Sequence, residues 1–158
     1  MRLQKRLAIL GDDSFAGEEC TIKYSRIQMC VGALSPDIAY VIPFPGASLK
    51  SMALLAAMEI PFVIAIPNVG WENLFNTEEK VFLRRCKREA AGVIYHSKNK
   101  FLVTSIFEEY ASTAAYMIDT CNMFLTLTNG TPKPILENII MDIDRAYPDM
   151  HVIIDCKK

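Results

Sequence analysis

Residues 43–48 (PFPGAS) have the composition of a loop that holds a phosphate group. Gly46 lets the backbone approach a ligand closely, and Ser48 can cap a helix or offer its hydroxyl to an anion. Lys50 follows in the first turn of a predicted helix, where a cation is slightly unfavourable unless an anion is bound beside it. The alternative is a simple corner with a solvated lysine.

Residues 128–133 (TNGTPK) form a second segment of this kind. Asn129, Gly130 and Thr131 stand just before a predicted helix, where unpaired backbone N–H groups attract anions. Lys133 again lies where a phosphate would compensate its charge. Neither segment fits the G-x-G-x-x-G or the Walker A pattern, so the fold must decide between a ligand loop and a turn.

Trp71 and Asp119 are candidates for further contacts with such a ligand. Trp71 follows an apolar run, and its indole ring offers a flat surface on which a base can stack. The alternative is that this ring covers one end of the core. Asp119 can bind a ligand hydroxyl or satisfy neighbouring backbone groups.

The remaining polar residues contain no recognisable nucleophile and base. No serine or cysteine lies in a G-x-S-x-G elbow or beside a spaced histidine. His96 is an acid–base candidate or a structural residue. Glu137 and Asp119 are the carboxylates retained as catalytic candidates, since either group can stabilise an oxocarbenium-like transition state.

The five cysteines predict neither a metal site nor a disulfide framework. They are widely spaced, form no C-x-x-C pair and have no histidine at metal-ligand spacing. We therefore expect reduced thiols, no metal and no cofactor.

Size and charge are those of an ordinary single-domain protein. The chain has 158 residues, of which 51% are hydrophobic, enough for one domain over residues 1–158. Its net charge of −1 favours neither a nucleic acid nor an anionic membrane as partner. The apolar run at the N-terminus is too short for a signal peptide or a membrane span. We expect a soluble, cytoplasmic protein, and the sequence leaves homo-oligomerisation open.

Short apolar runs alternate with longer segments of helical spacing, which predicts an α/β fold. The expected strands are residues 6–11, 37–43, 61–67, 91–97, 123–128 and 151–156. Most are apolar on both faces, as strands between two helix layers must be. The expected helices are residues 48–59, 76–90, 105–121 and 134–147. The predicted architecture is a Rossmann-like three-layer sandwich with a mainly parallel sheet, in which ligands bind beyond the carboxyl ends of the strands.

Three local expectations complete this architecture. Asn76 and Glu79 are spaced as a capping box at the start of the second expected helix. Residues 12–34 show no clear period and are expected to form a β-hairpin or an irregular insertion. In residues 105–121 the expected buried stripe is Phe107, Tyr110, Ala111, Ala114, Ile118 and Cys121.

The order of motifs over residues 37–156 resembles the SLOG superfamily. This Rossmann-like group includes the DprA/Smf proteins, the LONELY GUY phosphoribohydrolases and the YpsA-like proteins. The similarity is greatest to the YpsA-like branch, through PGASLKSMALLAAMEIPFVIAIP, GWENLF, AGVIYHS and YASTAAYMIDTCNMFLTLTNGTPKPILENI. The resemblance implies a nucleotide-related ligand at Gly46, Ala47, Ser48, Gly130 and Thr131, with Trp71 and Asp119 nearby.

Departures from the family pattern favour binding over catalysis. Thr113 and Ala114 stand where the family has an Arg-Asn pair, which removes a guanidinium from the implied phosphate site. Pro134 stands where the phosphoribohydrolases have a Glu, and Glu137 lies one helical turn further on. The sequence therefore predicts a protein that senses or sequesters a nucleotide-derived small molecule. The alternatives are an N-glycosidic hydrolase acting on nucleotides and an assembly subunit with a closed pocket.

Overall fold

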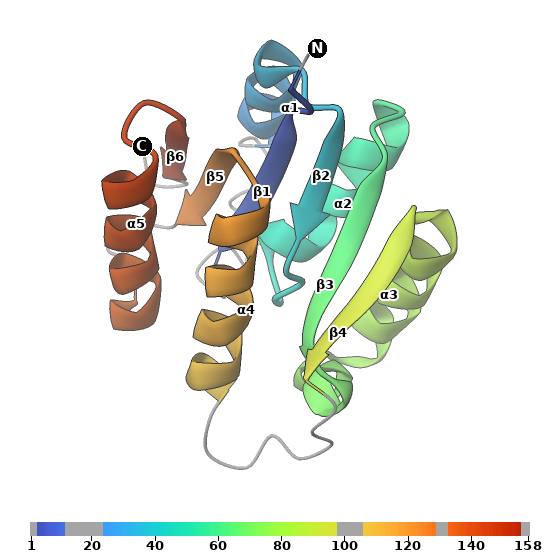
Figure 1. The fold of residues 1–158 in the computed structure, drawn as a ribbon. Helices are drawn as coiled ribbons and strands as arrows, with labels where there is room; N and C mark the ends of the chain where they lie inside the picture. Colours follow the sequence, from blue (N-terminus) through green and yellow to red (C-terminus); the bar gives the residue numbers. More distant parts are fainter. Residues whose placement is uncertain (1–2, 12–23, 98–105, 129–132, 156–158) are drawn as a thin grey trace.

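Six parallel strands form one central sheet in the computed structural model, which describes residues 3–11, 24–97, 106–128 and 133–155 (Figure 1). The strand order is β4-β3-β2-β1-β5-β6, and every neighbouring pair is parallel. The strands are β1 (Arg6–Gly11), β2 (Ile38–Val41), β3 (Phe62–Asn68), β4 (Gly92–Ser97), β5 (Met123–Thr128) and β6 (His151–Asp155). The predicted Rossmann-like α/β sandwich is confirmed.

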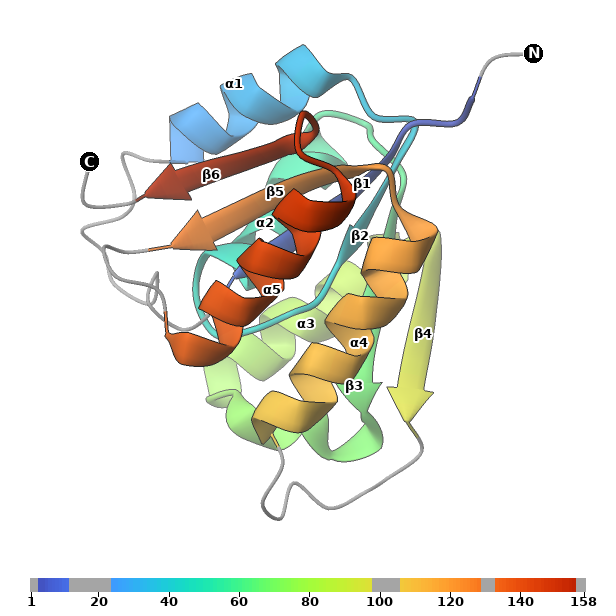
Figure 2. The same ribbon diagram turned by 60° about the vertical axis from the view of Figure 1, so that its left-hand side comes forward.

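Helices cover both faces of this sheet (Figures 1 and 2). One layer contains α1 (Tyr24–Leu34), α2 (Ala47–Ala57) and α3 (Thr77–Glu89), which contact one another in sequence. The opposite layer contains α4 (Ile106–Thr120) and α5 (Pro134–Ala146), and a short 3-10 helix, η3 (Val69–Leu74), leads from β3 to α3. This division follows from right-handed crossovers, because the chain builds outward from β1 to β4 and then returns over the other face to β5.

The return from β4 to β5 creates a topological switch point between β1 and β5. At this point the connections leave the sheet toward opposite faces. In open α/β sheets, ligands bind in the crevice outside the carboxyl ends of the strands at such a point. The strand order therefore identifies the carboxyl ends of β1 and β5 as the first place to look for a site.

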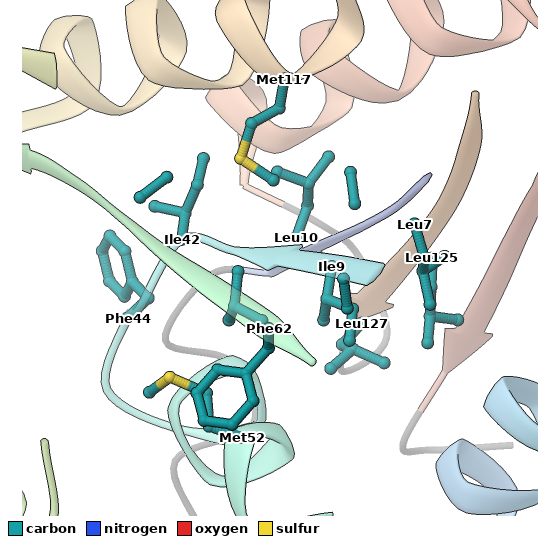
Figure 3. Close-up of a cluster of buried hydrophobic side chains, with 14 of the residues drawn as sticks. Leu7, Ile9, Leu10, Ile42, Phe44, Met52, Phe62, Met117, Leu125 and Leu127 are labelled. Carbon is teal, nitrogen blue, oxygen red and sulfur yellow. The ribbon is translucent and has the colours of Figure 1, made fainter. Parts of the chain in front are cut away.

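Buried aliphatic side chains fill the space between the sheet and both helix layers. Every residue of β3 and β5 is buried, which explains why these runs lack the alternation of a half-exposed strand. Leu10 points toward Met117 of α4, whereas Phe62 points toward Met52 of α2 (Figure 3). The sheet thus separates two apolar layers of one core.

Residues 24–34 do not form the expected hairpin or irregular insertion. They form the helix α1, which buries Ile27 and Val31 at a spacing of four residues. That spacing is helical, but the polar residues around it hide the period from a search for alternation. Residues 12–23, the rest of that expectation, lie outside the described residues.

The expected stripe of α4 is partly wrong. Tyr110 and Ala114 are buried as expected, but Phe107 is 49% exposed, and Thr113 and Met117 are buried beside them. The helix is therefore rotated toward Thr113, whose hydroxyl donates a hydrogen bond to the Glu109 carbonyl. That bond lets a polar side chain occupy a core position.

Within the described part of the chain, no helix has the length and apolar character needed to cross a membrane.

The capping box at the start of α3 is confirmed and provides a stability test. The side chain of Asn76 accepts a hydrogen bond from the Glu79 N–H at 2.8 Å, and the Glu79 carboxylate accepts one from the Asn76 N–H at 2.9 Å. Asn76→Ala should lower the free energy of unfolding by about 1 kcal/mol, measured by urea denaturation. Asn76→Asp keeps the acceptor and should stay within about 0.5 kcal/mol of the wild type. Equal losses in both variants would contradict the capping role.

Candidate functional site

The candidate site lies at the carboxyl edge of the sheet, around the ends of β1, β2 and β5. The register aligns Gly11 at the end of β1 with Leu127 of β5, and Ile9 with Val41 at the end of β2. The loop after β2 and the start of α2 therefore lie next to the switch point. Gly46 and Ser48 belong to this loop and helix start, as the sequence predicts.

The entrance of α2 is held by its own loop and presents backbone amides. Gly46 has φ 127° and ψ −143°, a conformation that essentially only glycine adopts without strain. The Ser48 hydroxyl accepts a hydrogen bond from the Phe44 N–H and can donate one to the Phe44 carbonyl, so it closes the loop instead of capping the helix. No side chain among the described residues caps α2. Its first N–H groups therefore keep no side-chain cap from these residues, at an entrance where Ser48 and Leu49 are buried and Lys50 is exposed.

Gly11 ends β1 in a close contact with the neighbouring strand. A Cβ atom at this position would lie 3.1 Å from the Leu127 carbonyl oxygen and 3.8 Å from the Ser48 Cβ. A side chain here would therefore crowd the Leu127 carbonyl of β5 and come into contact with Ser48 of α2. Gly11 was not among the predicted site residues, although a glycine at the end of an apolar strand indicates a close backbone approach.

The Tyr110 hydroxyl, on α4, is hydrogen-bonded to the backbone of Gly11 at the end of β1. It accepts a hydrogen bond from the Gly11 N–H at 3.0 Å and donates one to the Gly11 carbonyl at 2.7 Å. Tyr110 is 2% exposed, so these bonds satisfy a buried donor and a buried acceptor. The sequence analysis placed Tyr110 in the core stripe but missed this role.

Trp71 lies in the core and does not present its ring to the crevice. It is 0% exposed, its indole N–H donates to the Pro43 carbonyl, and its ring stacks on Tyr110 with centroids 6.2 Å apart. Phe44 meets both rings edge-on at 5.5 Å. We call Phe44, Trp71 and Tyr110 the aromatic plug. It joins the segments that follow β2 and β3 to α4, beside the end of β1. Of the two roles considered for Trp71 the structure supports the core role.

Two buried polar side chains at the carboxyl edge lack partners. The Thr128 hydroxyl at the end of β5 and both amide atoms of Asn68 at the end of β3 form no hydrogen bond with the residues that the structure describes. Thr128 is 3% exposed and Asn68 is 0% exposed. Buried polar groups normally have hydrogen-bond partners, because an unpaired one lowers the stability of the folded protein. These two side chains at the carboxyl edge depart from that rule.

The structure separates Asp119 from the other predicted site residues. Asp119 lies in the last turn of α4, which leads into the start of β5, so it belongs to the opposite edge of the sheet. This location removes Asp119 from the candidate site, because parallel strands place all their carboxyl ends at the other edge. Glu137 is exposed in the first turn of α5 and therefore lies at the carboxyl edge.

The second predicted loop is only partly described. Asn129, Gly130 and Thr131 lie outside the described residues, as does the side chain of Ala47 in the first loop. The described part begins at Lys133, the residue before α5, with Pro134 in the first turn. No side chain of the described residues caps this helix. Two uncapped helix entrances thus lie at one edge, on opposite faces of the sheet.

A groove of about 480 Å³ lies between α1, α2 and α3, on the face opposite the aromatic plug. It runs along the first half of α2, so it begins next to the uncapped entrance. The sequence analysis missed it, because its residues come from helices separated by strands. The lining residues are Tyr24, Leu49, Lys50, Ala53, Leu54, Glu78, Glu79 and Phe82.

A hydroxyl, an imidazole and a carboxylate form a chain elsewhere in the protein. His151 is hydrogen-bonded to Thr126 through Nε2 and to Asp144 through Nδ1, both at 2.7 Å. Thr126 is 0% exposed, so its hydroxyl is closed to a substrate. These residues connect β5, β6 and α5 structurally. His96 is exposed on the edge strand β4 and bonded to Ser112, away from the switch point.

Burial makes the described core thiols poor nucleophiles. It raises the pKa of Cys86 to about 11 and that of Cys121 to about 12, since the charged thiolate is disfavoured away from water. Cys30, Cys86 and Cys121 are free. In the described ranges, no group of three or more His, Cys, Asp or Glu residues is arranged to hold a metal ion.

The fold defines an α/β protein of the Rossmann-like class, with the switch point between β1 and β5. No protein-family model matches the sequence, and no curated protein is significantly similar to it.

The hydrogen bonds between Tyr110 and Gly11 give a test of the aromatic plug. Tyr110→Phe keeps the ring but leaves a buried N–H and a buried carbonyl unpaired at the end of β1. The free energy of unfolding should fall by about 1–3 kcal/mol in urea denaturation. Tyr147→Phe is the matched control, because the Tyr147 ring packs on Phe124 away from this edge, and it should change by less than about 0.5 kcal/mol. Equal effects would show that the hydroxyl does not hold the end of β1.

Proposed function

We propose that this protein binds a nucleotide or a nucleotide-derived small molecule at the carboxyl edge of the sheet, to sense or sequester it without efficient catalysis. The observation that carries the proposal is the entrance of α2. There Gly46 turns the chain, Ser48 bonds to Phe44, and the first amides of the helix keep no side-chain cap from the described residues. A phosphate group is the common anion that such an entrance accepts.

Charge and topology support a phosphate at this entrance. Lys50 is exposed in the first turn, where its charge opposes the helix dipole unless an anion is present. The switch point beside it is where this class of sheet binds ligands. The resemblance to the SLOG superfamily, in which Gly46, Ala47 and Ser48 correspond to a nucleotide loop, agrees with the proposal. The widely spaced cysteines fit a protein of the cytoplasm.

Binding is favoured over N-glycosidic hydrolysis because one of the two candidate carboxylates is absent from the site. Asp119 lies at the opposite edge, and Glu137 is exposed at the start of α5, on the face opposite the α2 entrance. Hydrolysis by Glu137 would release free base from nucleoside monophosphates, and Glu137→Gln would abolish that release.

An assembly subunit with a closed pocket is the second candidate. The aromatic plug favours it, because Phe44, Trp71 and Tyr110 pack against one another near the carboxyl edge of the sheet. Large apolar side chains that are at least 40% exposed also occur near α1 and β6, namely Met29, Met150 and Ile153. This candidate predicts a homo-oligomer that binds no nucleotide.

Thermal unfolding in the presence of ligands tests the proposal. The panel is AMP, ADP, cyclic AMP, ADP-ribose and inorganic phosphate. A ligand at 100 times its Kd should stabilise the protein by about 2.7 kcal/mol and raise Tm by several degrees. No shift with any member of the panel would contradict the proposal.

Charge reversal at the α2 entrance locates the bound anion. Lys50→Glu should weaken binding of the best ligand about tenfold or more, since a like charge replaces an opposite one near the phosphate. Lys5→Glu is the matched control, because Lys5 is also exposed but precedes β1 at the opposite edge. Equal losses in both variants would indicate a general effect of net charge and would exclude the α2 entrance as the site.

A further inference from the structure

The groove between α1, α2 and α3 has polar groups on two opposing walls. Glu78 and Glu79 line it from the first turn of α3, and Lys50 lines it from α2. Its apolar residues are Leu49, Ala53, Leu54 and Phe82. A volume of about 480 Å³ is that of a small-molecule site. The groove therefore suits a flat, mostly apolar body with hydrogen-bonding groups at its edges.

The carboxylates of α3 select for hydrogen-bond donors. One oxygen of Glu79 accepts the Asn76 N–H, which fixes that side chain against the helix and leaves its second oxygen available. Glu78 is exposed in the same turn. A carboxylate accepts hydrogen bonds and donates none when ionised, so this wall favours an amino group and disfavours a carbonyl.

The wall formed by α1 supplies a donor. The Tyr24 hydroxyl is buried and has no hydrogen-bond partner within the described ranges of the chain. Burial raises the pKa of Tyr24 to about 12, so the phenol is neutral at physiological pH and retains its proton. An acceptor on a ligand, reached by a turn of the Tyr24 side chain, would satisfy this group.

We propose that this groove holds the base of the nucleotide and selects an amino-substituted base of the adenine type, with its phosphate on the α2 entrance. The inference rests on the proposed function and adds the identity of the base. The exocyclic amino group faces Glu78 and Glu79, a ring nitrogen accepts from Tyr24, and the ring faces pack on Leu49, Leu54 and Phe82. Lys50 belongs to both the groove and the first turn of α2, so it connects the base subsite to the phosphate subsite.

The experiment compares AMP, IMP and ribose 5-phosphate by isothermal titration calorimetry on the full chain. IMP has a carbonyl where AMP has the amino group, and ribose 5-phosphate has no base. AMP should bind about 10- to 100-fold more tightly than IMP, the range of one hydrogen bond to a charged group. The double variant Glu78→Gln/Glu79→Gln should reduce this ratio to near one, because an amide can also donate to the IMP carbonyl.

Two further variants separate a specific effect from a structural one. Glu89→Gln changes a carboxylate at the far end of α3, outside the groove, and should leave the AMP to IMP ratio unchanged. Ala53→Trp fills the groove and should bring AMP down to the affinity of ribose 5-phosphate. Far-ultraviolet circular dichroism of each variant verifies folding.

The outcomes distinguish failure of the inference from failure of the proposed function. Equal affinity for AMP, IMP and ribose 5-phosphate would keep a phosphate site at α2 and overturn the base subsite. A preference for AMP that survives Ala53→Trp would also overturn it, since the base would then lie elsewhere. Binding of none of the three compounds would overturn the inference, and the five-compound thermal panel then decides the proposed function separately.

Discussion

The hydrogen bonds between the Tyr110 hydroxyl and Gly11 are the constraint on which the candidate site depends. They tie α4, which crosses over from the far edge of the sheet, to the end of the central strand β1. Because Gly11 also contacts Leu127 and lies near Ser48, one residue joins β1, β5 and the α2 entrance. The geometry of the switch point is therefore set by backbone groups, with Phe44 and Trp71 packed around them.

The two faces of the sheet therefore differ at the carboxyl edge. On the α4 face the three rings of the aromatic plug pack against one another. On the other face the uncapped start of α2, the exposed Lys50 and the groove follow one another along the helix. A phosphate attracted by backbone amides and an apolar body placed in a groove are separate physical effects. Their proximity makes a nucleotide-like molecule a better match than phosphate alone.

Most of the fold could be predicted from the sequence because apolar runs and helical spacing report burial directly. Strand β1 has the predicted bounds, and the cap at Asn76 and Glu79 depends only on local spacing. The candidate site was harder to predict than the fold, because its contacts join residues that are distant in sequence. The partnership of Tyr110 with Gly11 spans 99 positions, and Trp71 was ambiguous until its burial was known. Asp119 was placed near the ligand by the family resemblance, whereas the structure has it in the last turn of α4, at the opposite edge of the sheet.

The most direct test of the account is the change in backbone amide signals when AMP is added to ¹⁵N-labelled protein. A phosphate on the α2 entrance accepts hydrogen bonds from the first amides of that helix, so the largest shifts should fall on Ala47, Ser48 and Leu49. The amide of Gly11, already bonded to Tyr110, should shift much less. Shifts confined to other parts of the protein, or no shift at millimolar AMP, would contradict the central claim that this entrance is an anion site.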